Sequence, residues 1–191
     1  MTIGNGTTIH QSAIIHDDIV DIGKNCWIGE NVVIGCLSAS LLADKNGNIT
    51  RKEFKGRVII GDNVTIDTDT AIARGVISDT TIGIGSYIGT KCTIGHDVKI
   101  GHRCKVLHHT LICGHTIIGD DARINPGVLI SNRIIVGKKS TVGIGSLVIH
   151  DVPDGKTAFG HPARVRTLQG SITKLSKTRI RDDIAERSPH R

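Results

Sequence analysis

Residues 82–148 read IGIGSYIGTKCTIGHDVKIGHRCKVLHHTLICGHTIIGDDARINPGVLISNRIIVGKKSTVGIGSLV. Every sixth residue of this stretch is Ile or Val, and the residue after it is often Gly, as at Gly83 and Gly89. A repeat this strict predicts one structural unit copied along the chain. The repeated positions are Ile82, Ile88, Ile94, Ile100, Val106, Ile112, Ile118, Ile124, Ile130, Val136, Val142 and Val148.

A period of six matches neither the turn of an α-helix nor the two-residue alternation of a single strand. It fits a short strand followed by a corner, with one branched side chain pointing inward in each unit. Three units then close a triangular coil of about 18 residues, and the inward side chains stack into a continuous aliphatic core. Aromatic residues are only 2% of the chain, which agrees with such a core. The sequence therefore predicts an all-β parallel solenoid with Gly or small residues at its corners.

The repeat also covers the earlier part of the chain, with interruptions. It begins at Ile3 and Ile9 and resumes at Ile22 after a one-residue slip. The spacing from Ile72 to Ile82 is ten residues, which predicts a short bulge near residues 74–80. Each interruption is a place where the coil must deform.

The largest interruption is residues 36–57, CLSASLLADKNGNITRKEFKGR, which contains a turn sequence and must loop out from the coil wall. Insertions of this kind often carry function. Residues 159–164 are expected to cap the open end of the coil. We predict a β-helix over residues 1–165, followed by a basic tail over residues 166–191 that contains a short C-terminal helix.

The composition excludes several classes of protein. The net charge is +6 and the isoelectric point is near 9.2, yet no nucleic-acid recognition motif or aromatic platform is present. Binding of a small ligand that carries phosphate groups explains the positive net charge as well as binding of nucleic acid does. No segment approaches the roughly 18 apolar residues of a membrane span, and no secretion signal is visible, so we expect a cytoplasmic protein. The five cysteines form no CxxC pair and are expected to be small buried or corner residues.

Two stretches resemble known acyl-transferring enzymes. The segment GRVIIGDNVTIDTDTAIARGVISDTTIG (residues 56–83), with the insertion before it, resembles the UDP-3-O-acylglucosamine N-acyltransferase of lipid A synthesis. The segment from CTIGHDVKIG to HDVPDGKTAFGHPAR (residues 92–164) resembles the sugar N-acetyltransferases that make bacillosamine and perosamine derivatives. The chain is thus similar to the hexapeptide-repeat acyltransferases, and the resemblance implies a left-handed parallel β-helix that forms a homotrimer. The lipid A enzyme has a uridine-binding domain before its helix, whereas this repeat begins at Ile3, which favours a stand-alone sugar acyltransferase.

The resemblance also implies a catalytic set in the groove between two subunits. Its general base is His96, in the sequence HDVKIG, because an amine that attacks a thioester must lose a proton and His titrates near neutrality. Asp97 would hold the imidazole in one tautomer and stabilise its charged form. The backbone N–H of Gly114 would stabilise the oxyanion.

Other histidines crowd this region. Residues 18 apart stack on successive coils, so His115 lies next to Asp97; it is the second candidate for the base and is otherwise assigned to the donor site. His102 and His108 share the repeat position of His96 and are therefore expected on other faces of the triangle, as wall residues.

The resemblance implies a donor that lies along the coils. Acetyl-CoA or another acyl-CoA is expected, with an acyl carrier protein docked on the basic tail as the alternative, and no metal. By position, Pro126 and Ile144 would line the groove for the pantetheine arm. The basic side chains expected near the nucleotide phosphates are Lys138, Lys139 and Arg164.

The expected reaction moves an acetyl or other short acyl group to the amino group of a nucleotide-linked deoxy-amino sugar. The insertion at residues 36–57 is the candidate for contacting this acceptor. An O-acetyltransferase that acts on a saccharide hydroxyl is the alternative, because the same base serves both reactions.

The sequence argues against two other classes of protein. A carbonic anhydrase of the γ type binds zinc through three His at a subunit interface, but its paired ligands are five residues apart, whereas His96 and His102 are six apart. No His between Ile19 and Gly95 could supply the upstream ligand. A non-enzymatic scaffold would need no His-Asp pair at the catalytic position.

Overall fold

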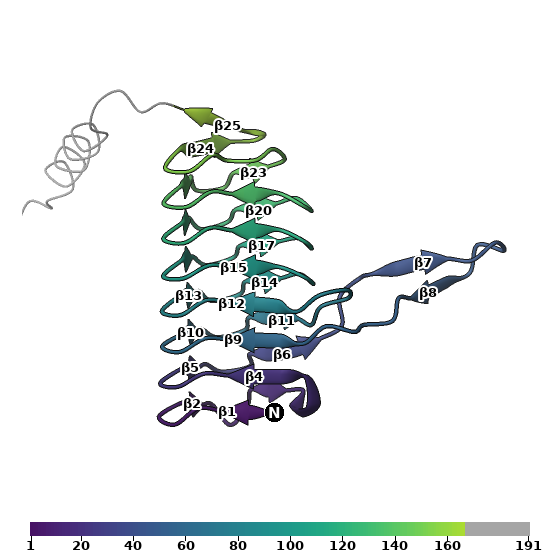
Figure 1. Ribbon diagram of the computed structural model, residues 1–191. Helices are drawn as coiled ribbons and strands as arrows, with labels where there is room; N and C mark the ends of the chain where they lie inside the picture. Colours follow the sequence, from purple (N-terminus) through teal and green to yellow (C-terminus); the bar gives the residue numbers. More distant parts are fainter. Residues whose placement is uncertain (167–191) are drawn as a thin grey trace, which may run out of the picture.

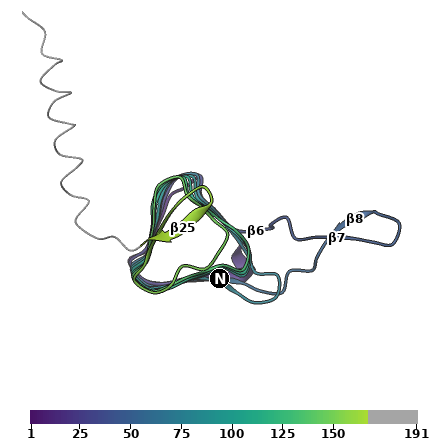
Figure 2. The same ribbon diagram turned by 90° about the horizontal axis from the view of Figure 1, so that it is seen from above.

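The computed structural model describes residues 1–166, which form a stack of triangular coils (Figures 1 and 2). The predicted helix of the C-terminal tail lies outside the described residues. Strands on each side of the triangle pair in parallel from coil to coil, for example Ile82 with Ile100 and Ile100 with Ile118. The predicted all-β hexapeptide solenoid and its 18-residue coil are therefore confirmed.

The three sides of the triangle are three sheets. The first sheet contains β1 (Thr2–Ile3), β4 (Val20–Ile22), β9 (Val58–Ile60), β12 (Thr80–Ile82), β15 (Lys99–Ile100), β18 (Ile117–Ile118) and β21 (Ile135–Val136). The second contains β2 (Thr8–Ile9), β5 (Trp27–Ile28), β10 (Thr65–Ile66), β13 (Tyr87–Ile88), β16 (Lys105–Val106), β19 (Arg123–Ile124), β22 (Thr141–Val142), β24 (Thr157–Gly160) and β25 (Ala163–Arg166). The third contains β3 (Ile14–Ile15), β6 (Val33–Cys36), β11 (Ala71–Ala73), β14 (Thr93–Ile94), β17 (Leu111–Ile112), β20 (Leu129–Ile130) and β23 (Leu147–Val148).

The core is aliphatic, as predicted, but each hexapeptide buries two side chains rather than one. The twelve repeated Ile and Val residues from Ile82 to Val148 are at most 3% exposed. The residue two positions before each of them is also buried and is usually small, as at Ser86, Cys92 and Cys104. The Ser86 hydroxyl donates to the Gly101 carbonyl at 2.8 Å and accepts the Cys104 N–H at 3.0 Å, so these side chains also tie successive coils together.

The corners differ from the prediction. The residue three positions after the inward Ile or Val has positive φ, and it is mostly Asn, Asp, Lys, Arg or His, as at Asn63 and Arg103, rather than Gly. The Gly directly after the inward residue is needed for close stacking: a Cβ on Gly83 would lie 2.5 Å from the backbone of Gly101 in the next coil. Small residues are therefore required by the distance between coils and not by the turn itself.

The predicted interruptions are present. The one-residue slip is taken up by a 3-10 turn, η1 (Asp17–Ile19). The insertion leaves the wall after β6 and forms a hairpin of β7 (Leu41–Ala43) and β8 (Ile49–Arg51), which pair only with each other and project away from the stack (Figure 1). At the top of the stack, β25 pairs antiparallel with β24 and caps the coil as expected.

No helix within residues 1–166 is long and apolar enough to cross a membrane. Three of the five cysteines, Cys26, Cys92 and Cys104, are buried in the core as expected, while Cys36 and Cys113 are half-buried. All five are free thiols.

Candidate active site

His96 and Asp97 form a closely coupled pair at the corner between β14 and β15. The Nδ1 atom of His96 lies 2.6 Å from Oδ2 of Asp97. Because an ionised carboxylate can only accept, Nδ1 carries a hydrogen, and in the neutral form of the ring the lone pair is therefore on Nε2. The His96 side chain is 18% exposed, and within residues 1–166 its Nε2 has no hydrogen-bond partner. The arrangement leaves an Nε2 atom that is both oriented and accessible.

The bulge before β12 holds the carboxylate of Asp97. Oδ1 accepts the N–H groups of Ile77 and Ser78 at 2.9 and 2.5 Å, and Oδ2 accepts the N–H of Val76 at 3.1 Å. The Ser78 hydroxyl adds a contact at 3.2 Å, and the Asp97 side chain is 1% exposed. Burial alone would raise the pKa of Asp97, but the hydrogen bond from His96 and those from the bulge outweigh it, so the pKa is held well below its usual range. The sequence predicted this bulge but not its role.

Gly114 lies one coil above His96, as the 18-residue spacing predicted. The His96 ring lies over it so closely that a Cβ on Gly114 would be 2.6 Å from Nε2. Gly114 is buried, and within residues 1–166 its N–H has no hydrogen-bond acceptor. A buried unpaired N–H is rare in a folded protein. The Gly114 N–H group is therefore a hydrogen-bond donor available to a ligand beside His96.

His115 also lies close to the pair but does not join it. Its Nδ1 is 3.8 Å from Oδ2 of Asp97, too far for a hydrogen bond, and its ring meets that of His96 edge to face at 4.9 Å between centroids. Burial lowers the pKa of His115, and the nearby charges of Arg133 and Lys52 act in the same direction. The structure therefore gives His96 the oriented tautomer and leaves His115 as a neighbour.

A pocket of about 420 Å³ opens beside the His-Asp pair. Its walls are the base of the insertion, residues 36–39, and the outward side chains of β11, β14 and β17. His96 and Gly114 also line it. The base of the insertion and the His96 corner thus share one cavity, although Ala39 and His96 are 57 residues apart in the sequence.

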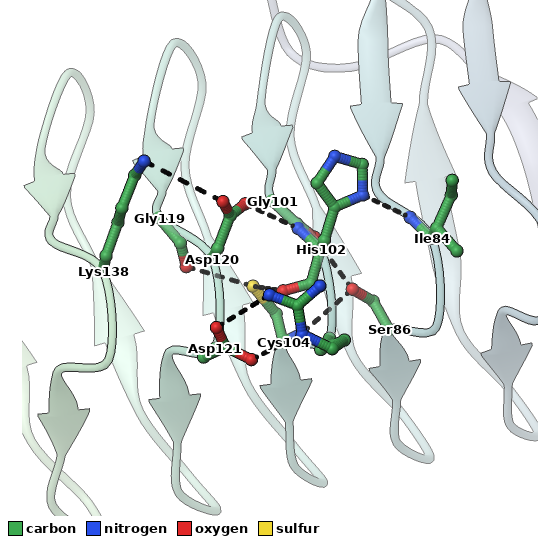
Figure 3. A network of polar contacts seen from close by, with 10 residues as sticks. Ile84, Ser86, Gly101, His102, Cys104, Gly119, Asp120, Asp121 and Lys138 are labelled. Atoms are coloured by element: carbon green, nitrogen blue, oxygen red, sulfur yellow. Dashed lines mark hydrogen bonds and ion pairs between the residues drawn. The ribbon is translucent and has the colours of Figure 1, made fainter.

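His102 and His108 lie on the other two corners, as predicted, and have a structural role. Nδ1 of His102 accepts the N–H of Ile84 at 3.0 Å, and Nδ1 of His108 accepts the N–H of Thr90 at 3.1 Å. Figure 3 shows the His102 corner, where Asp120 in the next coil accepts the N–H of His102 in the same way, at 2.9 Å. These side chains join one coil to the next and are directed away from the His96 corner.

The residues predicted to hold the donor are spread over the triangle. Pro126 and Ile144 follow β19 and β22 at the corner between the second and third sheets, and Ile144 is 76% exposed. Lys138 and Lys139 follow β21 at the corner between the first and second sheets, where Lys138 lies 3.9 Å from Asp120. Within one subunit, none of these four residues lies on the His96 corner.

Arg164 lies at the cap. It lines a separate pocket of about 200 Å³ together with His150 and Asp151. His150 is 54 residues after His96, three coils further up the same corner. Arg164 therefore shares a pocket with the residue that lies three coils above His96.

The ligand atoms of His96, Asp97 and His115 lie within 4.8 Å of one another, which is close enough to hold a metal ion. The hydrogen bonds do not fit that use, because both oxygens of Asp97 already accept N–H groups from the bulge. The histidines considered for a zinc site, His96, His102 and His108, lie on three different corners of one subunit. The arrangement fits a hydrogen-bonded catalytic pair better than a metal centre.

Residues 97–132 match the bacterial transferase hexapeptide family (six repeats). The chain is 41% identical over 64 residues to a UDP-3-O-acylglucosamine N-acyltransferase of Coxiella burnetii, covering 34% of this chain and 19% of that protein. It is 32% identical over 91 residues to the enzyme of the same name from Idiomarina loihiensis, covering 48% of this chain and 24% of that protein. The chain thus spans about a fifth to a quarter of the length of these relatives.

Two solved structures show the same fold. The UDP-N-acetylglucosamine acyltransferase from Campylobacter jejuni superposes with a TM-score of 0.75 at 23% identity, over 98% of this chain and 74% of that one. The perosamine N-acetyltransferase from Caulobacter crescentus, solved with CoA and GDP-perosamine, gives a TM-score of 0.55 at 20% identity, over 87% and 58%. The resemblance to hexapeptide-repeat acyltransferases is confirmed, and the proteins named here are acyl-transferring enzymes.

Proposed function

We propose that this chain is an acyltransferase that moves an acyl group from an acyl-CoA thioester to the amino group of a nucleotide-linked deoxy-amino sugar. The observation that carries the proposal is the coupled pair of His96 and Asp97 beside the unpaired N–H of Gly114. His96 and Gly114 line the same pocket, which supports a base and an oxyanion donor beside one reacting centre.

The reaction then proceeds by addition and elimination. The acceptor nitrogen attacks the thioester carbonyl while Nε2 of His96 takes a proton from it, and Asp97 stabilises the resulting imidazolium. The oxygen of the tetrahedral intermediate accepts the hydrogen bond from Gly114. When the C–S bond breaks, the departing thiolate takes the proton back from His96, which leaves an amide, a free thiol and the original base.

A homotrimer fits the distribution of exposed side chains. Two faces meet at the His96 corner, and both expose aliphatic residues: Ile117 and Ile135 on the first sheet, and Leu111 and Leu129 on the third. Exposed aliphatic faces of this kind mark protein interfaces. In a ring of three copies, the third sheet of one subunit would pack on the first sheet of the next, so that the His96 corner lies at the interface. A donor bound beside His96 of one subunit would then contact Pro126, Ile144 or Lys138 only where a neighbouring subunit supplies them.

The cap supports a place for the donor phosphates. Coils are about 4.8 Å apart, so His150 lies roughly 14 Å above His96 on one corner. Arg164 beside it is a cation that can pair with phosphate. An acyl-CoA whose thioester lies at Gly114 and whose phosphates lie at Arg164 would extend along the coils between the two pockets.

The test is a thiol-release assay with the purified chain, a panel of acyl-CoA donors and a panel of nucleotide amino sugars. His96→Ala should lower kcat by roughly a hundredfold or more, since positioned general bases contribute about that much. The matched control is His10→Ala in the first coil, which follows β2 and should leave kcat unchanged. Unchanged transfer in His96→Ala would remove His96 as the base, and transfer only to hydroxyl acceptors would replace the amine with an alcohol.

A further inference from the structure

A further pocket lies on the His96 corner, nearer the N-terminal end of the stack. Its volume is about 240 Å³, and it is lined by His16, Asp18, Ile19 and Arg74. His16 follows β3, Arg74 follows β11 and His96 follows β14, and these strands of the third sheet pair in order through β6. Arg74 is therefore one coil below His96, and His16 is three coils below it.

The insertion gives this part of the corner its irregular shape. In the second coil the chain leaves the wall after β6 and returns only at β9 (Figure 1). The two ends of the insertion, rather than a regular turn, therefore separate Arg74 from His16. The pocket lies at this interruption, and its lining is mostly polar.

Arg74 is held in a fixed position within the pocket. Its Nε donates to the carbonyl of Gly56 at 2.9 Å, and within residues 1–166 its two Nη atoms have no hydrogen-bond or ion-pair partner. A guanidinium anchored in this way presents its remaining N–H groups together. Such a planar set of donors suits the oxygens of a phosphate group.

Asp18 makes the pocket a poor site for a simple anion. Its side chain is exposed, lines the same pocket and makes no hydrogen bond or ion pair within the described part of the chain. An ionised carboxylate repels phosphate, but it accepts hydrogen bonds from hydroxyl groups. A ligand that carries both phosphate and a diol would satisfy Arg74 and Asp18 together. A nucleoside diphosphate has both groups.

We propose that this pocket binds the nucleoside diphosphate end of the acceptor, with its phosphates on Arg74 and its ribose hydroxyls on Asp18. The inference rests on the proposed function and gives it a direction. The donor occupies the corner above His96, toward Arg164, and the acceptor enters from below. Coils are about 4.8 Å apart, so the amino sugar has one coil to cross from Arg74 to Nε2 of His96.

The test measures binding of UDP, GDP, dTDP and inorganic diphosphate to the full chain by calorimetry, so that it does not depend on turnover. At least one nucleoside diphosphate should bind more tightly than inorganic diphosphate. Arg74→Gln should lower its affinity at least tenfold, because a hydrogen bond to a charged group contributes about that much. The matched control is Arg164→Gln, which should weaken acyl-CoA binding and leave the affinity for the nucleoside diphosphate unchanged.

Asp18→Ala changes an exposed side chain and keeps the test decisive if Arg74→Gln does not fold. It should weaken the nucleoside diphosphate and leave inorganic diphosphate unaffected. If inorganic diphosphate binds as tightly as every nucleoside diphosphate, the pocket holds only an anion and the assignment is wrong. Loss of nucleoside diphosphate affinity in Arg164→Gln would place the nucleotide at the cap and also overturn it.

The outcomes separate this site from the proposed function. If no nucleoside diphosphate binds, or if native and Arg74→Gln protein bind it equally, the acceptor site is overturned while acyl transfer in the thiol-release assay can still succeed. Binding that depends on Arg74, without acyl transfer to any acceptor, would overturn the proposed function and keep the nucleotide site.

Discussion

At the scale of single residues, Asp97 is the most heavily hydrogen-bonded side chain of the site. Asp97→Asn places an amide NH₂ among N–H donors from Val76, Ile77 and Ser78, so at least one buried donor loses its acceptor. We expect the free energy of unfolding to fall by about 2 to 4 kcal/mol, measured by chemical denaturation. The control is Asp120→Asn, a partly exposed corner residue that accepts one backbone N–H, where the loss should be under about 1 kcal/mol.

The sign of the pH dependence follows from the low pKa of Asp97. A carboxylate whose pKa is lower in the folded than in the unfolded state stabilises the fold above its ordinary pKa of about 3.9. That contribution is lost as the pH falls toward the folded value. The stability difference between the native chain and Asp97→Asn should therefore be full at neutral pH and shrink in strong acid. A difference that stays constant down to pH ~2 would contradict the ionised carboxylate.

Gly114 provides a second prediction. The three atoms nearest to an added Cβ all belong to the His96 ring, so Gly114→Ala should displace that ring without disturbing the coil. We expect kcat to fall by tenfold or more, with a melting temperature within a few degrees of the native chain. Gly85→Ala is the converse control: it has positive φ and no close neighbour, so it should cost stability, roughly 1 kcal/mol, and leave kcat unchanged. Equal kcat values in native and Gly114→Ala protein would show that the ring is not constrained there.

Part of the site could be read from the sequence. The 18-residue spacing placed Gly114 over His96 and His115 over Asp97, because parallel strands fix the register. The anchoring of Asp97 by the bulge could not be read, since three backbone N–H groups leave no signal in side-chain identity. The only signal was the ten-residue gap between Ile72 and Ile82.

At the scale of elements, the corners are joined by side chains that accept the N–H of the previous coil. His102→Leu removes the acceptor for Ile84 and should lower the free energy of unfolding by about 0.5 to 1.5 kcal/mol. His102→Asp should retain most of the stability, because Asp62 makes the same contact with the N–H of Lys24 at 2.7 Å. Thermal unfolding of the two variants provides the comparison. The interpretation fails if Asp and Leu are equally destabilising.

The projecting hairpin can be removed cleanly. The N–H of Lys52 donates to the carbonyl of Ser40 at 3.0 Å, so an Asn-Gly turn can replace residues 41–51. Because β7 and β8 pair only with each other, the melting temperature should change by only a few degrees. The KM of the acceptor should rise while the affinity for acyl-CoA is kept, because residues 36–39, which line the pocket beside His96, remain. A double variant, Leu41→Ser with Ile49→Ser, keeps the hairpin length and tests whether its exposed apolar side chains matter.

The elements also show where sequence reasoning reaches its limit. The inward Ile and Val residues and all the interruptions were predicted, since a buried position tolerates few side chains. The left-handed corner residues were not, because Asn63, Arg103 and His109 share a backbone angle but no side-chain property. For residues 36–57 the sequence predicts only a loop, whereas the structure shows the hairpin of β7 and β8.

At the scale of the whole molecule, the strands of the triangular stack within residues 1–166 pair with strands of the adjacent coils, as in other solenoids. The site uses three of them: the bulge from one coil, His96 and Asp97 from the next, and Gly114 from the one above. Its geometry therefore depends on the stacking of adjacent coils in the middle of the molecule, away from both ends.

The cap has a consequence for behaviour in solution. A stack of parallel strands is an open template, because its last coil exposes backbone groups that another copy could extend. The strand β25 returns antiparallel to β24 at this end, and we expect it, with the charges of Arg164 and Arg166, to block this growth. Removing residues 157–191 should convert dispersed protein into end-to-end filaments, visible by light scattering and electron microscopy. A chain that lacks only residues 167–191 is the control and should remain dispersed; if both remain dispersed, the cap has no role in preventing polymerisation.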